Sequence, residues 1–183
     1  MKFPFPSPIA LLKTSELSPI PVYRLTQPGL RFWENEEKVN RLYYSKLQQP
    51  EAVPILNYID VGAKDKEILR IYPLRDSMFV FKEDGLYRIS GEGSPFNLAL
   101  FDSSYILLAP DSISSIENVI YGWSRQGISS VTESGVRNVS RPIDVNLLPL
   151  SSDNYPNFSW ITWGIGYESD KTYTVFTNLQ SSD

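Results

Sequence analysis

Residues Ser77–Gly91 read SMFVFKEDGLYRISG, and this stretch decides the fold class. Two apolar runs, Met78–Phe81 and Leu86–Ser90, flank the polar segment Lys82–Gly85, which ends in Asp-Gly. Aromatic and β-branched runs on either side of an Asp-Gly turn are typical of a β-hairpin. We therefore predict two antiparallel strands joined at residues 82–85.

The same pattern recurs along the chain. Ser124–Gly127 (SRQG) predicts the turn of a second hairpin, and Glu168–Lys171 (ESDK) predicts that of a third. Short strands with turn signals about every 8–12 residues indicate an all-β fold. Only Asn35–Arg41 (NEEKVNR) is predicted to form a helical turn. The other predicted strands are Arg41–Lys46, Tyr58–Val61, Glu67–Tyr72, Tyr105–Leu108, Val119–Trp123, Ile128–Thr132, Trp160–Tyr167 and Thr172–Thr177.

An internal repeat relates the first two predicted hairpins. Their turn glycines, Gly85 and Gly127, lie 42 residues apart, and we expect Gly127 to need a positive φ. At this offset Phe81 matches Trp123, and a second step of the same length takes Trp123 to Ile165 with weaker agreement in its turn. A period of about 40–45 residues is that of one four-stranded propeller blade, which must stack on neighbours to bury its two apolar faces.

The predicted fold is therefore all-β, with antiparallel blades of a β-propeller and an extended, Pro-rich N-terminal arm. The arm covers residues 1–34 and the blades cover residues 35–183. Arg41–Thr177 spans about 137 residues, enough for about three to four blades, whereas propellers have about 4–8. Two alternatives stay open at this point. The strands form a smaller sandwich, or another segment or chain completes the propeller.

The composition excludes most familiar catalytic chemistry. The 183 residues include no cysteine and no histidine, so thiolate nucleophiles, imidazole acid/base catalysis and histidine- or cysteine-ligated metals are absent. With 21 acidic and 17 basic side chains the net charge is −4, which argues against a general nucleic-acid binder. No apolar run approaches the roughly 20 residues that a membrane-spanning helix needs.

Several stretches together resemble the β-propeller proteins of phage tails. The family is the nozzle, or tail tubular protein B, type of short-tailed phages, with the related packaged-DNA stabilisation proteins. The similar stretches cover about residues 41–177. They are Arg41–Pro54 (RLYYSKLQQPEAVP) with Asn57–Gly62 (NYIDVG), Ser77–Gly91, Ala109–Ile143 (including APDSI, NVIYGWSRQGISSV and NVSRPI), and Trp163–Thr177 (WGIGYESDKTYTVFT).

The resemblance implies a structural role without catalysis. Such proteins form a ring of identical chains at the distal end of a short tail, which suggests six-fold or twelve-fold symmetry. They contact other tail proteins (the adaptor and portal complex, the fibres) and extend the channel through which DNA is retained and ejected. The implied location is the virion, and the host cytoplasm during assembly. Acidic channel walls would repel phosphate and let the genome pass.

No catalytic, cofactor-binding or metal-binding residue is assigned from the sequence, and no cofactor is expected. A loose acidic set could supply a carboxylate pair for glycoside hydrolysis, but its members lie mostly in predicted turns. The two G-x-G pieces precede no helix, so we expect bulges or close sheet packing there. The acidic set is Asp60, Asp65, Glu67, Asp76, Glu83, Asp84 and Glu92, and the G-x-G pieces are Gly91–Gly93 and Gly164–Gly166.

For the other polar and aromatic residues we expect mainly structural roles. Two glycosylation sequons, Asn138–Ser140 and Asn157–Ser159, matter only in a secretory pathway. Ser140–Ile143 (SRPI) is a candidate for positioning a loop at a subunit interface, where arginine is enriched. Aromatic residues at strand spacing are expected to pack, although they could line a sugar-binding face. These are Tyr121, Trp123, Trp160, Trp163 and Tyr167; the scattered arginines are Arg24, Arg31, Arg125, Arg137 and Arg141.

Three functional hypotheses follow. The first is a structural protein of a phage tail nozzle. The second is a carbohydrate- or receptor-binding propeller module of such a tail. The third is a hydrolase with a carboxylate pair. A ring of identical chains favours the first hypothesis, glycan binding favours the second, and turnover abolished by substitution of one carboxylate favours the third.

Overall fold

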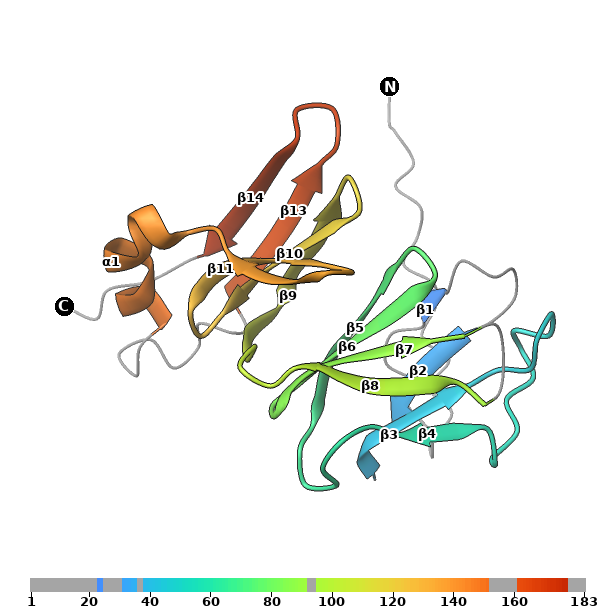
Figure 1. The fold of residues 1–183 in the computed structure, drawn as a ribbon. Helices are drawn as coiled ribbons and strands as arrows, with labels where there is room; N and C mark the ends of the chain where they lie inside the picture. The colour runs from blue at the N-terminus through green and yellow to red at the C-terminus, as the bar shows by residue number, and fades with distance from the viewer. Residues whose placement is uncertain (1–22, 25–30, 36–37, 92–94, 152–160, 178–183) are drawn as a thin grey trace.

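The computed structural model describes residues 23–24, 31–35, 38–91, 95–151 and 161–177 of the chain (Figure 1). The fold of these residues is all-β, and its strands form three four-stranded antiparallel sheets and one two-stranded hairpin. The first sheet comprises β1 (Tyr23–Arg24), β2 (Arg31–Asn35), β3 (Lys38–Tyr44) and β4 (Tyr58–Asp60). The second comprises β5 (Ile68–Leu74), β6 (Ser77–Lys82), β7 (Gly85–Ser90) and β8 (Asn97–Asp102).

The third sheet has the same topology as the first two. Its strands are β9 (Leu107–Ile116), β10 (Val119–Ser124), β11 (Gly127–Thr132) and β12 (Gly135–Asn138). In all three sheets the strands are neighbours in chain order, so each sheet is a simple meander. Short helices follow: η1 (Arg141–Ile143), α1 (Asp144–Leu147) and η2 (Leu148–Ser151). The hairpin of β13 (Thr162–Tyr167) and β14 (Thr172–Thr177) completes the described chain.

Apolar layers between successive sheets form the core. The first layer joins the first sheet to the second, and the second layer joins the second sheet to the third. A smaller third layer lies between the third sheet and the hairpin, where Ala109 and Trp123 contact Val175 of β14. The described part of the chain is therefore a stack of sheets, and within it the stack does not close into a barrel or a propeller.

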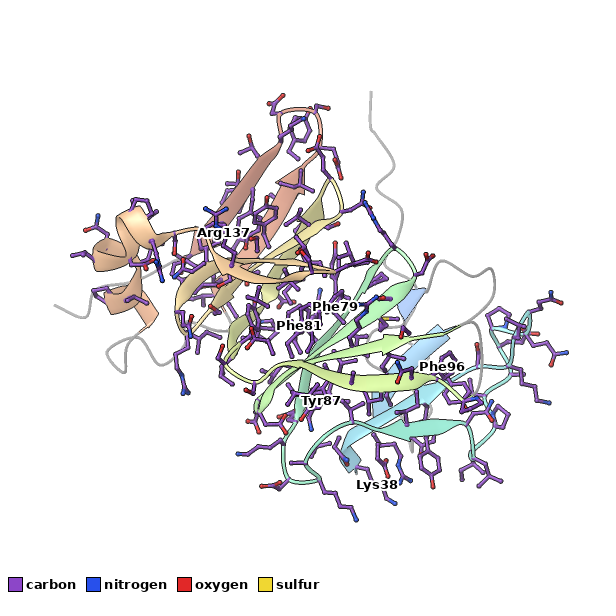
Figure 2. All side chains as sticks on the ribbon, viewed as in Figure 1. Lys38, Phe79, Phe81, Tyr87, Phe96 and Arg137 are labelled. Carbon is purple, nitrogen blue, oxygen red and sulfur yellow. The ribbon has the colours of Figure 1, made fainter. Side chains whose placement is uncertain are left out.

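The central strand β6 has buried residues on both faces, which explains its apolar run Met78–Phe81. All six of its residues are buried. Because side chains alternate along a strand, Met78 and Val80 enter the layer against the first sheet. Phe79 and Phe81 point the other way, into the layer against the third sheet (Figure 2). This is the stretch whose sequence predicted the first hairpin.

Lys82, at the end of β6, is fully buried and holds the connection between the first two sheets. Its ammonium group donates to the carbonyl oxygens of Val61 (2.7 Å) and Ala63 (2.9 Å) and lies 3.6 Å from Asp84 Oδ1. Asp84 Oδ2 also accepts hydrogen bonds from Tyr87 and from the Ala63 amide. Burial lowers the pKa of Lys82 from its ordinary value, whereas the carboxylate of Asp84 opposes this shift.

The structure confirms the hairpins and the repeat between the first two. The pairs β6–β7 and β10–β11 occupy positions 42 residues apart along their whole length. Each turn has two residues, because Lys82 pairs with Gly85 and Ser124 pairs with Gly127. Both glycines have positive φ, 141° and 103°. The third copy is different, because β13 and β14 form a two-stranded hairpin and not a four-stranded sheet.

The predicted helical turn at Asn35–Arg41 is wrong. Asn35 ends β2, and β3 starts at Lys38, while residues 36–37 lie outside the described ranges. Burial alternates along β3, with Asn40, Leu42 and Tyr44 inside. Pairing with β2 on one side and β4 on the other decides this segment, and this pairing overrides the weak local preference for a helix.

The predicted boundary between an arm and the sheets, at residue 34, falls inside β2. β1 and β2 pair with each other, and β2 pairs with β3, so this part of the N-terminal segment belongs to the first sheet. The prolines excluded a long helix there, but they did not exclude strands in the intervals between them. The rest of residues 1–34 lies outside the described ranges. The strands β8 and β12 were not predicted.

Gly127→Ala should destabilise the fold more than Gly135→Ala. A Cβ at Gly127 would overlap Ser140 Oγ and lie 2.8 Å from Asp144 Oδ1, whereas a Cβ at Gly135 meets nothing within 4 Å. Both glycines have positive φ, so the control, Gly135→Ala, strains the backbone without the steric clash. We expect a loss of about 2–3 kcal/mol at Gly127 against about 1 kcal/mol at Gly135, measured by urea unfolding. Equal losses would contradict the packing at this turn.

Lys82→Met should lower the free energy of unfolding by about 2–4 kcal/mol. The substitution keeps the volume but leaves Asp84 and two carbonyl oxygens without their buried cation. Lys64→Met, at an exposed lysine of the same connection, is the matched control and should change stability by less than about 0.5 kcal/mol. Equal unfolding midpoints for the two variants would refute the role assigned to Lys82.

Candidate functional site

The hairpin β13–β14 has one face that packs closely on the third sheet. Gly164 and Gly166 lie against the β9 backbone, and a Cβ at either position would collide with a carbonyl oxygen, that of Ser112 or Ser115. The expectation of close sheet packing at the second G-x-G piece is thus confirmed. For the first piece, residues 92–94 lie outside the described ranges. Glycine at alternate positions of β13 lets the two backbones approach.

Polar and aromatic contacts fix the hairpin on the third sheet. The amide of Gly166 donates to Ser114 Oγ (2.8 Å), and the hydroxyl of Tyr173 donates to the carbonyl oxygen of Ser112 (2.6 Å). The Tyr173 ring stacks on Tyr121 at 5.5 Å between centroids. Burial raises the pKa of Tyr173 to about 12. At the tip, Lys171 pairs with Glu117 of the β9–β10 turn at 2.7 Å.

The other face of the hairpin exposes four large apolar side chains. Trp163, Ile165 and Tyr167 alternate along β13, and Phe176 is the cross-strand partner of Trp163. Their exposed fractions lie between 47% and 57%, and the rings of Trp163 and Phe176 stack at 6.1 Å. We call these four residues the hairpin face. A contiguous exposed apolar surface of this kind marks an interaction site, so the hairpin face is the first candidate.

The outer surface of the first sheet is the second candidate. The guanidinium of Arg41 binds both carboxylate oxygens of Asp60 (2.6 and 2.8 Å) and lies 3.6 Å from the centroid of the Tyr58 ring. The ring of Tyr43 packs against that of Tyr58 on the neighbouring strand, with 6.0 Å between the ring centroids. The Arg41 guanidinium lowers the pKa of Asp60, and Asp60 raises that of Arg41. We call Arg41, Tyr43, Tyr58 and Asp60 the sheet-1 face.

The acidic residues of the sequence analysis do not form one cluster. Asp60 binds Arg41, Asp84 belongs to the Lys82 network, and Glu83 accepts a hydrogen bond from the amide of Glu67. Asp65 and Asp76 are exposed, and Glu92 lies outside the described ranges. Among the residues that the structure describes, no group of three or more acidic side chains is arranged to hold a metal ion.

The aromatic candidates separate into buried and exposed groups. Trp123 is buried, and Tyr121 packs on Tyr173, as the packing interpretation predicted. Trp163 and Tyr167 are instead exposed on the hairpin face, while Trp160 lies outside the described ranges. Sequence reasoning missed that Phe176 and Ile165 share this face. The available signal was the alternation of glycine with large side chains from residue 163 to 167, which gives one narrow and one bulky face.

The remaining polar candidates lie mainly in a network around η1. Asn138 donates to the carbonyl oxygen of Gln126 and to Asp144, and Ser140 Oγ accepts from the amide of Ile128. The first sequon is therefore structural in this fold, and the second lies outside the described ranges. Three of the arginines, Arg125, Arg137 and Arg141, are exposed, and Arg24 and Arg31 lie on β1 and β2.

Searches with protein-family models and against curated protein sequences find no match to this chain. Among the described residues, no helix is both long enough and apolar enough to cross a membrane. The candidate sites therefore rest on the geometry of the hairpin face and the sheet-1 face.

Tyr173→Phe should destabilise the chain at pH 8 but not at pH 11. The raised pKa means that the folded chain keeps a proton between about pH 10 and 12 that the unfolded chain has lost. The stabilising contribution is thus complete below pH 10 and is lost as the pH rises toward 12. At pH 8 we expect a loss of about 1 kcal/mol from the missing hydrogen bond. Above pH 10 the free energy of unfolding of the wild-type chain falls by up to about 1.4 kcal/mol per pH unit through Tyr173. At pH 11 this fall removes the difference in stability between the wild type and Tyr173→Phe.

Urea unfolding at the two pH values provides the measurement. Tyr167→Phe, on the opposite face of the same hairpin, is the matched control. A difference between wild type and Tyr173→Phe that stays constant from pH 8 to pH 11 would show that the hydroxyl is not buried against β9.

Proposed function

We propose that the chain is a structural virion protein of a phage tail, part of the nozzle or tube through which DNA is retained and ejected. The observation that carries the proposal is the succession of three four-stranded meanders stacked face to face through apolar layers. A four-stranded meander is the unit of a propeller blade, and propellers are built by stacking such units around an axis. The 42-residue spacing of β6–β7 and β10–β11 supports the same interpretation.

The proposed role is assembly and channel formation, not catalysis. The composition supports it, because a chain without cysteine and histidine lacks the most common nucleophiles and acid/base groups. The net charge of −4 suits a wall along which DNA passes without adhering, since like charges repel. The proposed partners are further copies of the chain in a six-fold or twelve-fold ring, and the neighbouring adaptor, portal and fibre proteins of the tail.

A carbohydrate- or receptor-binding role is the second candidate, and one observation favours it. Trp163 and Tyr167 are exposed on the same face of β13, and aromatic side chains can stack on sugar rings. A glycan array tests this role directly. Binding that is lost in Trp163→Ala and kept in Trp123→Phe, at a buried position, would favour the second candidate over the first.

The test of the first proposal is the position of the chain in the virion. Cryo-electron microscopy of virions that carry this protein should place it on the tail axis, at the distal end, as a closed ring. Density for the chain away from the tail axis, or its absence from purified virions, would refute the proposal.

A further inference from the structure

The two candidate faces lie at opposite ends of the stack of sheets. The first sheet is at one end and the hairpin β13–β14 is at the other, with the second and third sheets between them (Figure 1). The inner surfaces of both terminal elements enter apolar layers. Their outer surfaces, the sheet-1 face and the hairpin face, are where the stacking stops within the described residues.

We propose that the hairpin face docks on the sheet-1 face of a second copy of this chain, head to tail. Continuity with the internal layers is the first argument. Three successive apolar layers already join neighbouring sheets by face-to-face packing. The hairpin face offers the same kind of surface, with stacked Trp163 and Phe176 beside Ile165. Burial of such a surface in an intermolecular layer is favourable for the same reason as in the intramolecular ones.

The sheet-1 face is built to receive an apolar and aromatic surface. Arginine and tyrosine are enriched at protein interfaces, and both are present here. Two bonds to Asp60 and contact with the Tyr58 ring already fix the guanidinium of Arg41. A side chain held in one position loses little further conformational freedom when a partner binds, so docking on it costs less entropy.

Charge complementarity selects a head-to-tail arrangement over pairing of two hairpin faces. Residues 38–66, the described end with β3 and β4, carry five basic and three acidic side chains. The opposite end of the stack carries four basic and six acidic side chains, counted over residues 107–149 and 161–177. Two hairpin ends would bring like charge together, whereas the head-to-tail contact brings opposite charge together. A heterologous contact of this kind closes into a ring or extends as a filament.

The inference rests on the part of the proposed function that requires association of identical chains, and it names the surfaces that associate. The test uses the full 183-residue chain in sedimentation velocity from about 1 to about 100 μM. Wild type should show concentration-dependent association. Ile165→Lys, on the hairpin face, should weaken it by about tenfold or more, because it removes apolar contact and places a cation opposite the basic end.

A matched control separates the face from a general effect of added charge. Val145→Lys, at an 86% exposed position on α1, makes the same kind of change away from both faces and should associate as wild type does. Because Ile165 is half exposed, the Ile165→Lys chain should fold, which an unchanged urea midpoint would verify. Equal association of the two variants would overturn the proposal.

Mixing of variants tests the head-to-tail geometry. Tyr58→Glu alone, on the sheet-1 face, should weaken association as Ile165→Lys does, because its new carboxylate meets the acidic end. A mixture of Tyr58→Glu and Ile165→Lys chains retains one intact pair of faces, and its two altered faces carry opposite added charges, so the mixture should associate more strongly than either variant alone. Association of Tyr58→Glu alone as strong as that of wild type would overturn the head-to-tail arrangement and indicate pairing of two hairpin faces.

The outcomes also separate this inference from the proposed function. A wild-type chain that stays monomeric at about 100 μM overturns the inference even where the chain is found on the tail axis of virions. Quenching of tryptophan fluorescence by a glycan in that monomer, if it is lost in Trp163→Phe, would assign the hairpin face to carbohydrate instead. Association through the two faces by a chain that is absent from virions would uphold the inference and refute the virion role.

Discussion

The burial of β6 on both faces is the constraint on which the stacked arrangement depends. Met78 and Val80 supply the layer against the first sheet, while Phe79 and Phe81 supply the layer against the third. The apolar run of this strand has no face that water solvates well, so both of its faces must be covered by other parts of the chain. The first and third sheets are thus held in the molecule through opposite faces of the second sheet.

Lys82 adds a polar restraint to this apolar arrangement. A charge in the interior is tolerated only when it is paired and hydrogen-bonded, and Lys82 has two carbonyl oxygens and the Asp84 carboxylate around it. Hydrophobic contacts are not directional, whereas hydrogen bonds are. The directed bonds of Lys82 fix the chain between β4 and β5, and thereby the position of the first sheet against the second.

The same principle of layers explains why the ends of the stack are interaction surfaces. Each internal sheet covers its neighbours on both sides, whereas among the described residues the first sheet and the hairpin β13–β14 each pack on one neighbouring sheet. Gly164 and Gly166 have no side chains, so the hairpin can pack closely on β9. That packing turns the bulky side chains of β13 outward, so the exposure of Trp163 and Ile165 is a consequence of how tightly the opposite face is packed.

Local sequence was sufficient for the hairpins, because a turn glycine and its flanking apolar runs act within a few residues of each other. The two-residue turns at Gly85 and Gly127, their positive φ and the 42-residue repeat followed from the sequence itself. The strand at Lys38–Tyr44, the place of β1 and β2 in a sheet and the composition of the hairpin face were decided by tertiary structure. Those features depend on strand pairing within a sheet and on packing between sheets, and no local pattern reports which sheet covers a strand or which of its faces remains uncovered.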